Sequence, residues 1–214
     1  MRRVLGIDPT LHTRQSPAYR GFMHQIHADP GLGDLSAMLE HRLSETAEEL
    51  RPEDLRSLID PIARSLFGAA MSVIGSDSAT IWVADKERTK LTVGFADEEP
   101  KLIGQEQPLD KGLISLVLAS EHAICENKVY QHAEHSKLID DALGFITCGM
   151  IAVPFYLGGQ LSGVISCVQL KKCESDSDPD GFTAAHLSEV QKISKVIERL
   201  VNYRIVQLLL DLHT

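Results

Sequence analysis

Several side chains that can bind metal ions lie close together between residues 122 and 140. They are His122, His132, His135 and Asp140. His132 and His135 are three residues apart, so on a helical turn they would face one side and could hold a metal ion. Asp140 or Glu134 would complete such a site. The alternative is a solvated polar loop, in which histidine is common, and we favour it: we predict no metal site.

The cysteines are the other candidates for chemistry, and they are Cys125, Cys148, Cys167 and Cys173. None forms a C-x-x-C pair, so the sequence signals neither a zinc knuckle nor a thioredoxin-like redox pair. We expect them to remain reduced thiols. The chain also lacks a Ser-His-Asp order, a P-loop and a G-x-G-x-x-G motif. We therefore predict no catalytic residues and a protein that is not an enzyme.

Composition narrows the class of protein. The 214 residues contain 30 acidic and 21 basic side chains, a net charge of −9, with 43% hydrophobic residues. This apolar content is typical of a folded globular protein, and the acidity argues against a nucleic-acid partner. No signal-peptide-like apolar stretch follows Met1, and no run approaches the 18 apolar residues of a membrane span. We expect a cytoplasmic protein.

The elements that must position these residues follow from hydrophobic periodicity. Residues 1–31 are rich in Pro and Gly and predict an irregular arm, followed by a helix at 32–52. A second helical segment runs from Pro52 to Val73, and Pro61 predicts a kink or a restart capped by Asp60. Further helices are expected at 112–119 and 137–143, and a long last helix after Thr183; strands are expected at 78–84, 91–95, 123–126, 149–156 and 161–170. This order predicts an α+β fold with helices packed on an antiparallel sheet.

Six segments in this order resemble a GAF domain, the small-molecule sensor module of signalling proteins. They are residues 79–85, 110–115, 139–147, 150–154, 163–166 and Phe182-Thr183, within a region covering 53–205. The resemblance implies a central antiparallel sheet of about six strands with long N- and C-terminal helices. It also implies that a ligand lies between the sheet and the loops and short helices over it. Residues 206–214 would end a signalling and dimerisation helix.

The resemblance also implies which residues contact the ligand: Thr80, Leu113, Ile114, Leu143, Thr147 and Ser166. Thr147 can donate a hydrogen bond, and the backbone amides of Leu113 and Ile114 can meet an anion at a helix start. The identity of the ligand stays open. The acidic residues gather mainly in 40–60, 97–99 and 174–180, so the net charge does not argue against a small anion.

Known GAF chemistries can be tested against these residues. Cyclic-nucleotide-binding members carry an Asn-Lys…Phe-x-x-x-Asp-Glu pattern, and here Phe182 matches while the other positions are Gln169, Leu170, His186 and Leu187. The Lys–Asp ion pair of that pattern is therefore absent, although a cyclic nucleotide stays possible. Bilin attachment needs a Cys beside a pocket His, and neither His132 nor His135 has one. A free methionine-sulfoxide reductase needs paired pocket cysteines, for which Cys125 and Cys148 are the candidates; otherwise they are small buried apolar side chains.

The last helix carries apolar residues close to a seven-residue rhythm, and Ile205, Leu208, Leu209, Leu210 and Leu212 lie beyond the stretch that the sheet can cover. They pack either against the helix at 34–50 or in a homodimer, and the resemblance favours the homodimer. We interpret the chain as a regulatory sensor domain that relays a signal through dimeric helices to an output domain or partner protein. The alternatives are the reductase and a degenerate domain that only dimerises or docks a partner.

Overall fold

The computed structural model describes residues 30–97 and 100–210. The helices are α1 (Pro30–Glu49), α2 (Pro52–Leu58), α3 (Pro61–Val73), α4 (Leu113–Ser120), α5 (Leu138–Leu143) and α6 (Ala184–Leu209), with short 3₁₀ turns η2 (Pro100–Leu102) and η3 (Val129–Gln131). The strands are β1 (Ser78–Ala84), β2 (Lys90–Ala96), β3 (Glu106–Pro108), β4 (Ile124–Asn127), β5 (Ile146–Leu157) and β6 (Gln160–Lys171). Helix α1 begins at Pro30, inside the segment predicted as an irregular arm, and the arm up to residue 29 lies outside the described residues.

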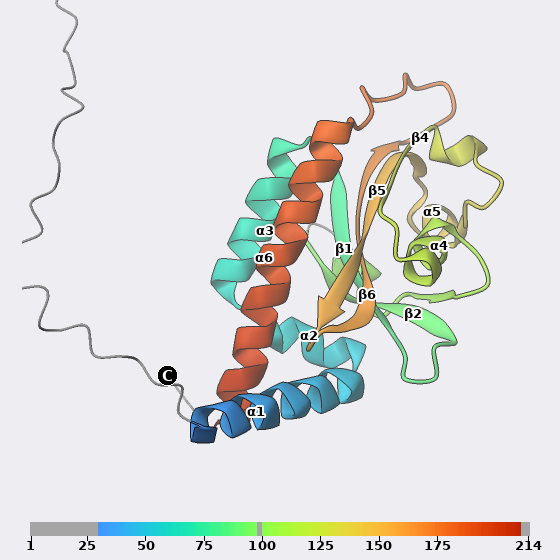
Figure 1. The fold of residues 1–214 in the computed structure, drawn as a ribbon. Helices are drawn as coiled ribbons and strands as arrows, with labels where there is room; N and C mark the ends of the chain where they lie inside the picture. Colours follow the sequence, from blue (N-terminus) through green and yellow to red (C-terminus); the bar gives the residue numbers. More distant parts are fainter. Residues whose placement is uncertain (1–29, 98–99, 211–214) are drawn as a thin grey trace, which may run out of the picture. The chain divides into compact units, whose positions relative to one another are not determined.

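The described strands form one six-stranded antiparallel sheet in the order β3-β2-β1-β6-β5-β4. The α+β fold and the antiparallel sheet of about six strands are thus confirmed. Strand β3 was not among the segments expected from periodicity, because its three residues are too few to show an alternation. Figure 1 shows α3 and α6 on one side of the sheet and α4 and α5 on the other.

Local sequence explains where the helices begin. Helices α2 and α3 each open on a proline, whose fixed φ suits the first helical turn. The Asp60 side chain accepts a hydrogen bond from the Ala63 amide at 2.8 Å, so the helix restarts at Pro61 rather than kinking. Thr183 caps α6 in the same way, by accepting from the His186 amide. Both caps confirm the sequence prediction.

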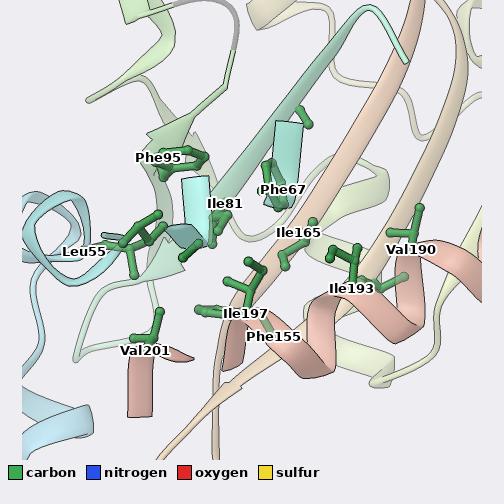
Figure 2. Packing of buried hydrophobic residues seen from close by; sticks show 14 of the residues in the cluster. Leu55, Phe67, Ile81, Phe95, Phe155, Ile165, Val190, Ile193, Ile197 and Val201 are labelled. Carbon is green, nitrogen blue, oxygen red and sulfur yellow. The ribbon is translucent and has the colours of Figure 1, made fainter. Parts of the chain in front are cut away.

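The helix-facing side of the sheet holds a closely packed hydrophobic core (Figure 2). Phe67 of α3 meets Phe95 of β2 edge-to-face, with ring centroids 5.6 Å apart. Strand residues alternate between the two sides, so Ile81 and Ile165 point into this core while Trp82 and Val164 belong to the opposite one. We call these the helix side and the cavity side of the sheet.

Polar side chains of α6 accept hydrogen bonds from backbone amides at the end of β5 and in the turn after it, where β4 does not pair with β5. Strand β4 pairs with β5 only from Gly149 to Ala152. Beyond it, the Tyr156 amide donates to the buried carboxylate of Glu198 at 3.1 Å, and the Gly158 amide donates to Asn202 at 3.0 Å. An exposed strand edge is thereby closed by the long helix.

The end of α6 corrects one expectation. Ile205 is 1% exposed and belongs to the same core cluster as Ala47, so this residue packs within the chain. Leu208, Leu209 and Leu210 are exposed, as expected of a surplus apolar end, and Leu212 lies outside the described residues. For Ile205 the intramolecular alternative therefore holds, in a core that also includes Ala47.

Candidate functional site

A cavity lies on the cavity side of the sheet, under α4 and α5. Its volume is about 60 Å³, several times the roughly 10–15 Å³ that one water molecule needs. The walls are mainly apolar: Leu102, Leu113, Ile114, Ile139, Leu143, Phe145, Met150, Val168 and Leu170. The remaining lining is polar or amphipathic: Ser78, Thr80, Trp82, Gln107, His135, Ser136, Asp140, Thr147 and Ser166. Apolar walls with a few convergent polar groups are typical of small-molecule sites.

All six residues that the sequence singled out for ligand contact lie in the lining of this cavity: Thr80, Leu113, Ile114, Leu143, Thr147 and Ser166. They come from β1, α4, α5, β5 and β6, so the fold brings together positions up to 86 residues apart. Their contact with a ligand stays a prediction.

The floor of the cavity is a buried hydrogen-bonded group on the two central strands. Thr80 and Ser166 are register partners across β1 and β6, and their hydroxyls are 2.9 Å apart. The Trp82 indole N–H donates to the Ser166 hydroxyl at 3.3 Å. Because strand residues alternate, Ser78, Thr80 and Trp82 all face the cavity. Of these three residues only Thr80 was predicted to contact a ligand, although the same alternation places Ser78 and Trp82 on the same face.

A second polar group lines the opposite part of the cavity. The Asp140 carboxylate of α5 accepts hydrogen bonds from the Thr147 hydroxyl at 2.6 Å, the Thr147 amide at 3.0 Å and His135 Nε2 at 3.0 Å. Burial raises the pKa of Asp140, but the hydrogen bonds from His135 and Thr147 outweigh it and hold that pKa below the ordinary value of 3.8. Asp140 is therefore an ionised carboxylate at neutral pH.

A bulge in β5 is what brings Thr147 to Asp140. Thr147 pairs with Leu170 and Gly149 with Gln169, so Cys148 is an extra residue in the ladder. Without it, Thr147 would share the face of Ile151, which belongs to the helix-side core. Strict alternation of side chains therefore would not have placed Thr147 in the cavity.

Helix α4 begins beside Gln107. Gly112, its first flanking residue, has φ 93°, and a β-carbon there would collide with the Gln107 amide. Gln107 Nε2 donates to the Lys111 carbonyl at 3.0 Å and to the Ser115 hydroxyl at 3.1 Å. The first turn of α4, whose backbone amides we predicted could bind an anion, therefore lies next to the neutral side-chain amide of Gln107.

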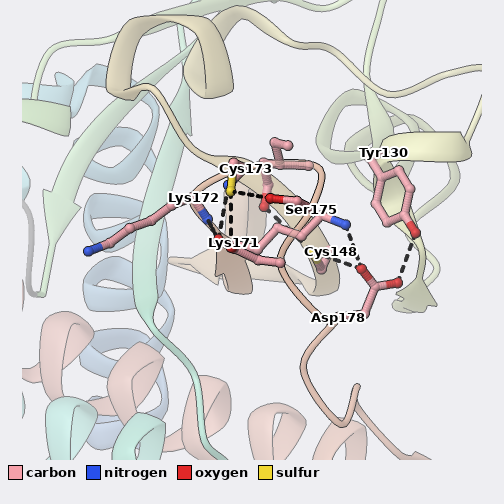
Figure 3. Close-up of polar contacts among 9 residues, drawn as sticks. Tyr130, Cys148, Lys171, Lys172, Cys173, Ser175 and Asp178 are labelled. Carbon is pink, nitrogen blue, oxygen red and sulfur yellow. Dashed lines mark hydrogen bonds and ion pairs between the residues drawn. The ribbon is translucent and has the colours of Figure 1, made fainter.

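The candidate cysteines lie elsewhere. Neither Cys125 nor Cys148 is among the residues that line the cavity. Cys125 packs against the helix-side core, and Cys148 lies beside Asp178, which also binds Tyr130 and Lys171 (Figure 3). Burial raises the pKa of both thiols, and the nearby carboxylates of Glu126 and Asp178 raise it further.

The histidines do not assemble as metal ligands. His135 pairs with Asp140, whereas the His132 ring accepts a hydrogen bond from the Glu134 amide and His122 is exposed. Within residues 30–97 and 100–210, no group of three or more His, Cys, Asp or Glu side chains could hold a metal ion.

The positions of the cyclic-nucleotide pattern fall outside the cavity, except Leu170. Gln169 is buried and donates to the Gly75 carbonyl at 3.0 Å, and its Oε1 has no partner in the described structure. Phe182 is buried, and both its backbone polar groups bind the Asn127 side chain. An ion pair of the same residue types does form nearby, at 2.7 Å between Asp178 and Lys171, which is one residue beyond the lysine position of the pattern.

The domain is an antiparallel sheet with long helices packed on one side and short helices over a cavity on the other. A family model described as the GAF domain matches residues 58–201, well over half of the sequence. The chain belongs to the GAF domain family.

Solved structures agree with this fold. The GAF domain of a phosphoenolpyruvate-protein phosphotransferase from Coxiella burnetii is 14% identical, with a TM-score of 0.55 over 78% of this chain and 92% of that one. The corresponding domain from Acinetobacter is 14% identical, with a TM-score of 0.52 over 79% and 94%. A free methionine-R-sulfoxide reductase from Neisseria meningitidis, solved with its substrate, is 16% identical, with a TM-score of 0.50 over 78% and 90%. These identities establish similarity of fold alone.

Two further findings concern the sequence and the helices. No sequence among curated proteins matches the chain significantly. In the described part of the chain, no helix is long and apolar enough to cross a membrane.

Proposed function

We propose that this GAF domain is a non-catalytic regulatory domain that binds a small molecule in the cavity over its sheet. The observation that carries the proposal is that the cavity lies over Thr80 and Ser166, on the two central strands. Elsewhere such positions are filled by packed apolar side chains, as Ile81 and Ile165 show on the helix side. Here two hydroxyls and an indole N–H form a polar floor, which a bound molecule would cover.

Binding can be tested on the full chain by thermal unfolding with a panel of cyclic nucleotides, oxo-acids and haem. A ligand at 100 times its Kd stabilises the folded state by about 2.7 kcal/mol, which raises Tm by about 5–10 °C for a chain of this size. Ser166→Leu would fill the floor of the cavity and abolish the shift. Ser162→Leu, on the same strand but outside the cavity lining, serves as the matched control and retains it.

Two outcomes would contradict the proposal. One is a shift that persists in Ser166→Leu, because the ligand would then bind elsewhere. The other is no shift with any compound together with a crystal structure in which protein side chains fill the cavity, which would favour a degenerate domain that only dimerises or docks a partner.

The positions of the thiols support the non-catalytic proposal over the reductase alternative. A reductase needs thiols that can reach a pocket-bound sulfoxide, whereas Cys125 and Cys148 lie outside the lining. Raised thiol pKa values also lower the fraction of reactive thiolate at neutral pH. Reduction of free methionine sulfoxide by the wild-type chain, lost in Cys125→Ser or Cys148→Ser, would favour the reductase instead.

We further propose that two copies associate through α3 and α6 and relay the bound state along these helices. On α3, Ile62, Leu66 and Val73 form an exposed apolar stripe, with Ile62 73% and Val73 84% exposed. Their spacing of four and seven residues follows one face of a helix. Val196 and Tyr203 are exposed on α6, which packs against α3 (Figure 1). An output domain or partner protein in the cytoplasm would receive the signal.

Association can be measured by sedimentation equilibrium of the full chain. Leu66→Glu places a charge in the stripe and should raise the dimer Kd at least tenfold, about 1.4 kcal/mol. Ser65→Glu adds the same charge at the neighbouring exposed position and should leave the Kd unchanged. A wild-type chain that is monomeric at micromolar concentration would contradict the dimer. For relay, the ligand must bind the two helix arrangements with different affinity, so it must change the dimer Kd or its helix-to-helix distances.

A further inference from the structure

The hydrogen-bonding groups of the cavity identify the chemical class of its ligand. We infer that the cavity takes a small, largely apolar molecule whose polar end donates a hydrogen bond to His135, and that it selects against carboxylates and phosphates. This inference rests on the proposed ligand-binding function and deepens it. Three observations carry it: the charge of the lining, the use of its polar hydrogens and the orientation of the His135 ring.

The charge of the lining disfavours an anion. Asp140 is a buried carboxylate with its pKa below the ordinary value, and it is the only acidic side chain among the described lining residues. The same described lining contains no lysine or arginine. An anionic ligand would therefore enter next to a negative charge, at least partly removed from water, without a fixed opposite charge.

Several polar hydrogens of the lining are already donated to protein acceptors. The Trp82 indole N–H binds Ser166, and both the amide and hydroxyl hydrogens of Thr147 bind Asp140. Gln107 Nε2 uses its two hydrogens on Lys111 and Ser115. Ser78, Ser136 and one of the paired Thr80 and Ser166 hydroxyls retain hydrogens that can be donated. The backbone amides of Leu113 and Ile114, in the first turn of α4, also belong to the lining. These donors are all neutral and the described lining offers an anion neither lysine nor arginine, while the His135 ring is a candidate acceptor for a hydrogen of the ligand.

The His135 ring provides the acceptor that is held most firmly. Its side chain is 5% exposed, and Nε2 lies 3.0 Å from the Asp140 carboxylate. An ionised carboxylate only accepts hydrogen bonds, so Nε2 carries a proton, and in the neutral form of the ring Nδ1 is an acceptor. Among the described residues, no hydrogen bond is formed by Nδ1. Asp140 thus acts as a positioning residue that sets the tautomer, and His135 is the specificity-determining one.

The experiment compares isobutyramide with isobutyrate, which have nearly the same shape: the amide is neutral and donates hydrogen bonds, whereas isobutyrate is an anion that only accepts them. Binding to the full chain is followed by NMR titration up to 50 mM at pH 8, where an ordinary imidazole is neutral. Isobutyramide should bind the wild-type chain at least tenfold more tightly than isobutyrate, the effect of about one buried hydrogen bond.

Two variants test the role of the ring. In Asp140→Asn an oxygen at the Oδ1 position can still accept from the Thr147 hydroxyl, while an NH₂ group at the Oδ2 position donates to His135 Nε2 and loses the hydrogen bond from the Thr147 amide. The ring proton then moves to Nδ1, which becomes a donor, so the preference should reverse toward isobutyrate. If that variant does not fold, His135→Phe keeps a ring without the acceptor and should reduce the preference to the part that comes from the charge of Asp140. His122→Phe, at an exposed histidine, is the matched control and should retain the wild-type preference.

The outcomes separate the two proposals. Isobutyrate binding as tightly as isobutyramide, with shifts in cavity residues, would overturn the ligand class and leave the binding function standing. A preference for the amide that is unchanged in both Asp140→Asn and His135→Phe would overturn the role of the dyad. No binding of either probe by a folded chain, or shifts confined to residues away from the cavity, would overturn the binding function and the ligand class together.

Discussion

The two sides of the sheet are built from the same strands but differ in how their polar and apolar groups are used. On the helix side, α2, α3 and α6 cover the strands, and Phe67, Ile165 and Ile197 are fully buried. On the cavity side, the same central strands carry Thr80 and Ser166, and short elements leave a cavity above them. The helix side is packed without such a cavity, so we expect its side chains to contribute more to the free energy of unfolding. The cavity side is less completely packed, and polar groups line the space that remains.

Polar groups show the same division. On the helix side, the buried carboxylate of Glu198 accepts hydrogen bonds from the Tyr156 amide and the Ser194 hydroxyl. It also forms an ion pair with Lys195 at 2.9 Å. These contacts complete a strand edge. On the cavity side, the buried carboxylate of Asp140 instead orients a histidine at the cavity wall. Glu198 therefore binds a backbone amide at a strand edge, whereas Asp140 orients a side chain of the cavity lining.

The largest expected effect contrasts two isoleucines. Ile197→Ala, in the helix-side core, should lower the free energy of unfolding by about 4 kcal/mol, in the upper part of the usual range. Ile114→Ala, at the cavity wall, should lower it by about 2 kcal/mol, because one side of Ile114 already faces a space and loses fewer contacts. Urea denaturation of both variants measures the difference. Equal losses would show that the two sides are packed alike.

A smaller effect tests the polar contacts of the helix side. Glu198→Leu should lower the free energy of unfolding by about 1–3 kcal/mol, because the Tyr156 amide loses its acceptor at a half-buried edge. Glu198→Gln retains an oxygen at this place and serves as the control, with a loss of less than about 1 kcal/mol. The measurement is again urea denaturation. If Glu198→Leu is as stable as the wild type, water or a shifted α6 must replace the lost acceptor.

The contrast between the two sides also explains what the sequence could predict. Periodicity and caps located the helices and long strands, because Asp60, Pro61 and Thr183 act through local backbone geometry. The six proposed contact residues came from the resemblance to GAF domains, and the fold gathers them around one cavity. Periodicity could not place Thr147, since the bulge at Cys148 reverses the alternation.

Other parts of the site depend on contacts between distant segments, which periodicity does not reveal. Gln107 lies on a strand of three residues, and its role depends on the close approach to Gly112. His135 and Asp140 were noted for their side-chain types, but their pairing depends on how the loop before α5 folds. Ile205 is likewise buried in a core built from segments distant in the sequence, and periodicity left open whether it packs within the chain or in a dimer.

The smallest expected effect is a pH dependence that comes from the cavity side. The pKa of Asp140 in the folded chain lies below its ordinary value of 3.8, so its hydrogen bonds with His135 and Thr147 stabilise the folded state while the carboxyl is ionised. This stabilisation is present above the ordinary pKa and is lost as pH falls through the lower, folded-state pKa. The free energy of unfolding of the wild type should therefore exceed that of Asp140→Asn at pH 6, and the difference should shrink below about pH 4. Urea denaturation of both chains at several pH values measures it, and a difference that stays constant down to about pH 2 would mean that Asp140 is not ionised in the cavity wall.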